Sequence, residues 1–159
     1  MFNQIFPRRV DNTYRGYNLA LWLFGLLVLM KTGISLGTIF NGYTAASSAD
    51  GIPLDTFTPA GARAVVSLFA LWGLCQLMIC LLCVLVLVRY RGMVPFMFAL
   101  LLLEHLSRRL ILHIMPIETT GAPPGYFINL GLLALMICGL ALSLWSKGDQ
   151  TRERTADEA

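Results

Sequence analysis

Four long apolar runs dominate the pattern of hydrophobic and polar positions along the chain. They comprise residues 17–40, 64–88, 93–115 and 126–146. Each run has about 20 residues or more, which is enough for a helix to cross roughly 30 Å of hydrocarbon. None alternates in and out as the strands of a membrane barrel do. The sequence therefore predicts an all-α integral membrane protein, a four-helix antiparallel transmembrane bundle. Its single domain, residues 17–146, lies between a basic N-terminal segment (residues 1–16) and a polar tail (residues 147–159).

Composition excludes an ordinary water-soluble domain. Of the 159 residues, 57% are hydrophobic and only 13% are charged, and the mean hydropathy is +0.69. Soluble domains carry about 25% charged residues. The pI near 8.8 does not indicate a nucleic-acid partner, because the basic residues are not gathered into one patch interleaved with aromatic residues. They lie at the ends of the apolar runs, as in membrane proteins.

The distribution of basic residues predicts the orientation. Eight of the twelve Lys and Arg residues fall at the ends that would share one side: Arg8, Arg9, Arg15, Arg89, Arg91, Lys147, Arg152 and Arg154. Cytoplasmic loops are enriched in Lys and Arg. We therefore expect a multi-pass protein of the cell inner (plasma) membrane with both termini cytoplasmic. The first run exceeds the apolar region of about 7–15 residues in a cleaved signal peptide, so we expect it to be retained.

Small residues predict which helix faces point inward, because they allow helices to approach closely. The first run contains Gly33 and Gly37 in GxxxG spacing, which we assign to packing within the bundle, with dimerisation as the alternative. The expected inward faces of the second and fourth runs follow helical spacing. They are Gly73, Gln76, Cys80 and Cys83 on the second run, and Gly131, Ala134, Cys138 and Ala141 on the fourth.

The loop after the first run carries local signals. Thr58 followed by Pro59 is typical of a helix N-cap and first helical position. The pair Asp50-Gly51 predicts a tight turn. We interpret Asp50 and Asp55 as isolated turn or capping acids.

The segment EHLSRRLILH, residues 104–113, is the clearest chemical signal in the chain. Without it, the third run would extend for about 11 residues, or about 16 Å, which is half a bilayer. The segment therefore continues the membrane span. Charges at this depth cost roughly 2.5–3.5 kcal/mol each and normally pair inside the protein. Glu104 and Arg108 are four residues apart, so we expect them to pair.

Polar residues of other spans fall at similar depths. Lys31, with Ser35 and Thr38 on its face, is level with Arg108, and Gln76 is close to the level of Glu104. Asn129 lies just inside the edge of the fourth run. These positions predict one intramembrane site in the middle and outward half of the bundle. Its candidate ligand-binding residues are Lys31, Gln76, Glu104, His105, Arg108, Arg109 and His113.

The expected charges favour an anionic or acceptor-rich ligand. Lys31, Arg108 and Arg109 outweigh Glu104, giving 3 − 1 = +2 before histidine is counted. Such a surplus suits an anionic lipid head group or a quinone-like molecule. The structural alternative is that the arginines, Lys31 and His113 snorkel toward the head groups while Glu104 and Arg108 pair.

Other chemistry is disfavoured. The two histidines are eight residues apart on one helix, about 12 Å, so they cannot share one metal or haem iron. We expect no metal, cofactor or catalytic residue. Cys80 and Cys83 form a CxxC, similar to quinone-coupled disulfide-forming membrane enzymes, but we assign them to packing because apolar surroundings make thiols poor nucleophiles.

The length, the four runs and Lys31 late in the first run loosely resemble the DoxX-like group of small bacterial membrane proteins. No motif of that group allows residue roles to be transferred. The sequence favours a non-enzymatic accessory or interaction protein, or a binder of the ligands named above, with a membrane-protein partner or homo-oligomer as further partners. The alternative is a membrane redox enzyme, which the resemblance implies, or a small proton-coupled transporter.

Overall fold

The computed structural model describes residues 14, 16–119, 121 and 123–145, and these are helical without a strand. The elements are α2 (Asn18–Phe40), α3 (Gly42–Thr44), the π-helical turn η1 (Ala45–Ala49), the 3-10 turns η2 (Leu54–Thr56) and η3 (Arg91–Met93), α4 (Pro59–Arg89), α5 (Val94–Ile114) and α6 (Pro124–Leu144). The predicted all-α class is confirmed. Five α-helices are present in the described part of the chain rather than four, because the loop after α2 contributes α3. The predicted tail and most of the N-terminal segment lie outside the described residues.

Local chemistry explains where the long helices begin. The Thr58 hydroxyl accepts a hydrogen bond from the backbone N–H of Gly61 at 3.2 Å, and Pro59 occupies the first turn of α4. This confirms the predicted N-cap and starts α4 five residues before the apolar run at residue 64. Proline also lies in the first turns of α5 and α6, where its missing N–H has no intrahelical partner to lose.

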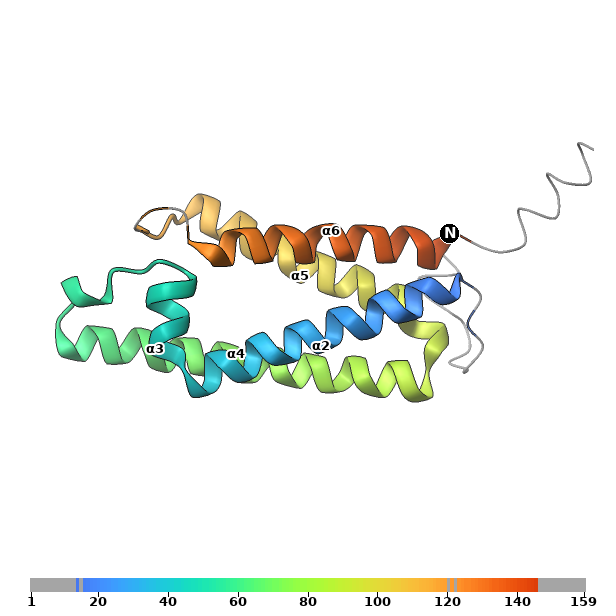
Figure 1. The fold of residues 1–159 in the computed structure, drawn as a ribbon, viewed down its shortest axis with the longest axis horizontal. Helices are drawn as coiled ribbons and strands as arrows, with labels where there is room; N and C mark the ends of the chain where they lie inside the picture. The colour runs from blue at the N-terminus through green and yellow to red at the C-terminus, as the bar shows by residue number, and fades with distance from the viewer. Residues whose placement is uncertain (1–13, 15, 120, 122, 146–159) are drawn as a thin grey trace, which may run out of the picture.

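The four long helices pack around an apolar core (Figure 1). Helix α2 lies along α4 and also contacts α6, while α5 packs mainly on α6. Phe24 and Phe98 meet edge to face with ring centroids 5.0 Å apart, and both are fully buried. Gly139 lies directly against the Phe98 ring, where a Cβ would collide with it. We call this half of the molecule, centred on Phe24 and Phe98, the core end.

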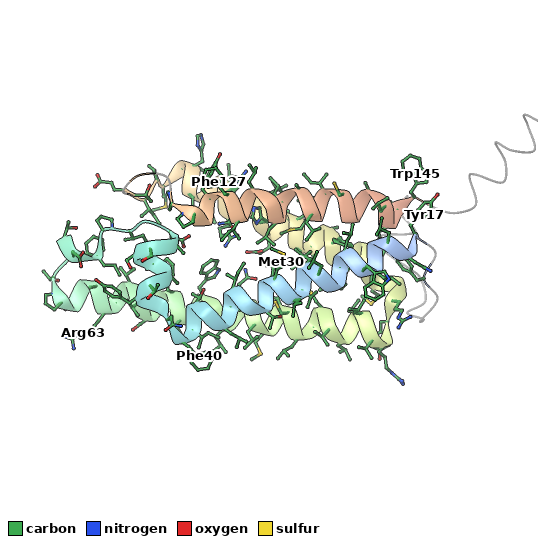
Figure 2. The ribbon with its side chains drawn as sticks, in the orientation of Figure 1. Tyr17, Met30, Phe40, Arg63, Phe127 and Trp145 are labelled. Carbon is green, nitrogen blue, oxygen red and sulfur yellow. The ribbon has the colours of Figure 1, made fainter. Side chains whose placement is uncertain are left out.

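The outer surface of these helices is apolar. Helices α2, α4 and α6 are each long and apolar enough to cross a membrane, yet only 33, 28 and 22% of their most apolar windows are buried. Phe40, Phe127 and Trp145 project from the helices with 77, 64 and 60% of their surface exposed (Figure 2). Helix α5 differs because it carries three charged side chains, Glu104, Arg108 and Arg109. An apolar exterior of this extent is typical of a protein surrounded by lipid.

The small-residue predictions succeed on one helix and fail on two. Gly73, Gln76, Cys80 and Cys83 are all buried on α4, as predicted. Gly33 and Gly37 are exposed, and a Cβ at either would meet nothing within 4 Å, so the assignment to packing within the bundle is wrong. The predicted α6 face is also wrong. Gly131, Ala134, Cys138 and Ala141 are exposed.

The fit between facing side chains, and not the small size of individual residues, determines which faces of α2 and α6 point inward. On α6 the buried residues are Gly125, Leu132, Met136, Gly139 and Ser143, a mixture of large and small side chains, of which Gly139 fits against the Phe98 ring. On α2 the stripe of Lys31, Ser35 and Thr38 is buried, and Ser35 and Thr38 lie against Gly73, whose missing Cβ lets the backbones approach. Because the outer faces are equally apolar, hydrophobicity does not distinguish inside from outside on these helices.

Residues 41–58 fold back over one end of the long helices, and we call them the cap. Figure 1 shows α3 and the turn η1 running from the end of α2, beside the N-terminal part of α4, toward the start of α6. Ala46, Ile52 and Leu54 form a small buried core with side chains of α4. Gly51 has φ +72°, which confirms the predicted turn at Asp50-Gly51. A Cβ on Gly125 would collide with the Ala49 carbonyl, so the cap rests directly on α6.

Candidate functional site

A buried ion pair joins α2 to α5 beneath the cap. Lys31 Nζ donates to Glu104 Oε2 at 3.0 Å, and Lys31 is only 7% exposed. Gln76 of α4 donates from Nε2 to the other carboxylate oxygen at 2.7 Å. The sequence places Lys31 inward because it shares one helix face with Ser35 and Thr38, whose hydroxyls bond back to their own helix. Three helices therefore supply one closed network around Glu104.

Arg108 does not pair with Glu104, contrary to the expected i,i+4 ion pair. Its Nη2 donates to Asn129 Oδ1 of α6 at 3.3 Å and lies 3.2 Å from Nδ1 of the buried His105. The guanidinium also stacks over the Trp72 ring of α4, 4.9 Å from the centroid. Lys31 satisfies Glu104 instead, because its amine reaches the carboxylate from the facing helix and leaves Arg108 directed toward α6.

These two networks lie on the wall of one cavity of about 420 Å³. Helices α2, α4, α5 and α6 and the cap all contribute to it. Its polar wall consists of Lys31, Ser35, Thr38, Gln76, Arg108 and Asn129, joined by Asn41, Thr44, Ser48 and Asp50. Ile34, Trp72, Ile128 and Leu132 supply apolar surface. Pockets of about 300–1,000 Å³ with a few convergent polar groups are typical of small-molecule sites.

The cavity has a different charge balance from the one the sequence predicts. Asp50, expected to be an isolated loop acid, lies on the cavity wall at the end of η1. Burial raises the pKa of its carboxyl, and the positive charge of Arg108 opposes that rise. With Glu104 against Lys31 and Asp50 facing Arg108, the formal balance of these four groups is 2 − 2 = 0. The expected surplus of +2 is therefore absent from this group.

The structure brings five of the seven predicted site residues together and leaves two apart. Lys31, Gln76 and Arg108 line the cavity, while Glu104 and His105 are bonded to them. Arg109 instead lies over the Tyr126 ring, 5.9 Å from its centroid. His113 is exposed near the end of α5. The snorkelling interpretation thus fits His113 but does not fit Lys31, whose amine turns inward to Glu104.

Two polar atoms of this region are buried without a hydrogen-bond partner in the described part of the chain. They are Gln76 Oε1 and His105 Nε2. Buried polar groups are nearly always satisfied by protein, water or a bound molecule. Gln76 is 7% exposed and lines the cavity, while its Oε1 atom is buried without a hydrogen-bond partner in the described residues.

Sequence reasoning missed Trp72 and Asp50. Trp72 precedes Gln76 by four residues on α4, so helical spacing places the two on one face. No comparable signal exists for Asp50, because its position depends on how the cap folds back onto α6.

Metal and thiol chemistry have no structural support in the described residues. No group of three His, Cys, Asp or Glu side chains there is placed to hold a metal ion. Cys80 and Cys83 are buried without a disulfide on the inward face of α4, which agrees with a packing role. Comparisons of the chain with protein-family models, curated proteins and solved structures found no match.

Proposed function

We propose that this chain is a four-span protein of the bacterial inner membrane, with α2, α4, α5 and α6 crossing the bilayer and both termini cytoplasmic. Helix α5 has 21 residues and extends about 31 Å, which matches the hydrocarbon thickness. Its ionisable groups lower the hydropathy of the segment, but Glu104 is paired with Lys31 and Arg108 is stacked on Trp72. Inward-facing and partnered charges are the form in which spans tolerate such residues.

In this membrane the chain acts as a non-enzymatic binder or accessory protein that holds a membrane-soluble ligand by its polar head group. The observation that supports this is the cavity itself. Polar side chains from each of the four long helices line one space of about 420 Å³, namely Lys31, Gln76, Arg108 and Asn129. Anionic lipid head groups and quinone-like rings both present the oxygen acceptors that Lys31, Arg108 and Asn129 would bind.

The ligand site is tested by native mass spectrometry of protein extracted in mild detergent. Wild type is compared with Arg108→Ala and with the matched control Arg109→Ala, since the second arginine lies outside the cavity wall. We expect a bound lipid or quinone-like molecule in wild type and in Arg109→Ala, and its loss in Arg108→Ala. Ligand-free protein in all three, at equal yield, would overturn the binding function and favour a structural role.

A proton-coupled transporter or redox enzyme using the same residues would respond differently to Glu104→Gln. A proton-transfer role requires the carboxyl group, so this change would abolish activity. A binder requires the donors of Lys31 and Arg108, so ligand occupancy in the same mass spectra should persist. Loss of occupancy in Glu104→Gln, with folding intact, would contradict a site that depends on donors alone.

A further inference from the structure

The exposed residues of the cavity wall locate its mouth. Ile34 and Gly37 of α2 line the cavity and are exposed, as are Pro124 and Ile128 of α6. Three cap residues share both properties, namely Asn41, Thr44 and Ser48. The α4 residues Gly73 and Gln76, by contrast, are buried in its wall. Figure 1 shows α2 diverging from α6 toward the cap. The cavity therefore opens between α2 and α6, beside the cap.

The mouth includes the last two turns of α2 and the first turn of α6. Gly37 and Ile34 precede the last residue of α2 by about 5 and 9 Å, and Ile128 follows the first residue of α6 by about 6 Å. Beyond these ends the cap forms part of the cavity wall, and its Ala49 lies against Gly125 of α6. In the proposed orientation, Ile34, Gly37 and Ile128 face lipid and the cap lies on the aqueous side of the mouth.

The groups inside the cavity indicate the chemistry of the head group. Lys31 and Arg108 are balanced by Glu104 and Asp50, so the wall offers little net charge to an anion. The uncharged side chains of Ser35, Thr38 and Asn129 also line the cavity, and hydroxyl and amide groups can accept hydrogen bonds as well as donate them. Trp72 adds a flat aromatic surface. A neutral ring carrying carbonyl or hydroxyl oxygens matches this combination better than a phosphate does.

We infer that the ligand is an uncharged, lipid-soluble molecule with an oxygen-bearing ring, of the quinone or phenol class, which enters from the bilayer between α2 and α6. This inference rests on the proposed binding function and specifies its ligand class and route. The apolar tail of such a molecule would leave through the mouth past Ile34 and Ile128, while the ring would lie against Trp72 and the polar wall.

Two glycines provide a matched pair for testing the route. Gly33 and Gly37 are both exposed on α2, and a Cβ at either meets nothing within 4 Å, but only Gly37 lines the cavity. Leucine is favourable in a helix, so Gly37→Leu and Gly33→Leu should both fold. The larger side chain obstructs the mouth only at position 37.

The fluorescence of Trp72 provides the readout. The chain has three tryptophans, and in a Trp22→Phe, Trp145→Phe background only Trp72 remains. The protein is placed in nanodiscs of phosphatidylcholine, and a decyl-substituted benzoquinone, which quenches tryptophan fluorescence, is titrated. We expect saturable quenching, at least tenfold weaker apparent affinity in Gly37→Leu, and unchanged affinity in Gly33→Leu. Phosphatidylglycerol added to the nanodiscs should not compete.

Three results would overturn this inference. Equal affinity in the two leucine variants would exclude the route between α2 and α6. Competition by phosphatidylglycerol would exclude a neutral head group. Quenching without saturation would exclude binding of the quinone or phenol class. The mass spectra distinguish these failures from failure of the binding function itself. A phospholipid lost only from Arg108→Ala would preserve the binding function and reject the ring-bearing ligand, whereas ligand-free wild type would reject both.

Discussion

The two halves of the same four helices are built differently. At the core end, Phe24, Phe98 and Met136 are fully buried and Gly139 fits against an aromatic ring. At the cap end, the same helices place Lys31, Gln76 and Arg108 around a cavity of about 420 Å³. Apolar packing is sufficient to join helices in lipid, whereas ionisable groups at that depth are costly. We therefore attribute stability mainly to the core end and the proposed ligand binding to the cap end.

The substitution with the largest expected effect tests whether stability and ligand binding depend on different ends of the molecule. Phe98→Ala removes a fully buried ring and leaves a void beside Gly139. We expect a loss of about 3 kcal/mol in the free energy of unfolding, at the lower end for buried phenylalanine because lipid replaces water around the helices. Reversible unfolding in mixed micelles measures it. The control Phe127→Ala, at an exposed position, should change stability little, and ligand occupancy should survive in both variants.

The second prediction concerns the link between the halves. Glu104→Met leaves the amine of Lys31 buried without its carboxylate, so we expect a loss of about 2 kcal/mol. The double variant Lys31→Met, Glu104→Met removes both charges and should recover most of that loss. The same unfolding assay, applied to wild type, both single variants and the double variant, measures the coupling energy between the two side chains. Additive losses would show that the two side chains do not stabilise each other.

A smaller effect is expected from Asp50 as the pH changes. Because burial raises the pKa of its carboxyl, the folded protein binds this proton more tightly than the unfolded chain. Stability should therefore fall as the pH rises from the ordinary aspartate pKa through the raised value in the folded state. Thermal melts from mildly acidic to neutral pH should show this slope in wild type and a shallower one in Asp50→Asn. Identical slopes of stability against pH in the two proteins would show that Asp50 does not contribute to the buried charge balance.

The smallest expected effect lies outside the cavity. Arg109 stacks on the exposed Tyr126, and such cation–π contacts contribute about 0.5–1 kcal/mol. Arg109→Ala should lower stability by no more than this amount and leave binding unchanged. A large loss of ligand in this variant would extend the site beyond the wall described above.

Helical spacing and span length were enough to predict the long helices and the region where polar residues of different spans meet. The level of a residue in a span follows from its distance to the helix end, which correctly placed Gln76 near Glu104. The same calculation put Lys31 level with Arg108, whereas its amine pairs with Glu104. Helix rotation could not be calculated in the same way. Gly33 and Gly131 point outward, since an apolar chain in lipid has no hydrophobic contrast between its faces. Asp50 was missed because a fold-back of the cap, and not local sequence, brings it to Arg108.

The most direct test of the central claim is a crystal structure of the wild-type protein grown in a lipidic mesophase from its native membrane extract. We expect a bound molecule in the cavity, with an oxygen within hydrogen-bond distance of Arg108 or Gln76. Its apolar portion should leave the cavity between Ile34 and Ile128. A cavity closed by Trp72 and Ile128, or one containing only water, would contradict the assignment of the cap end to ligand binding.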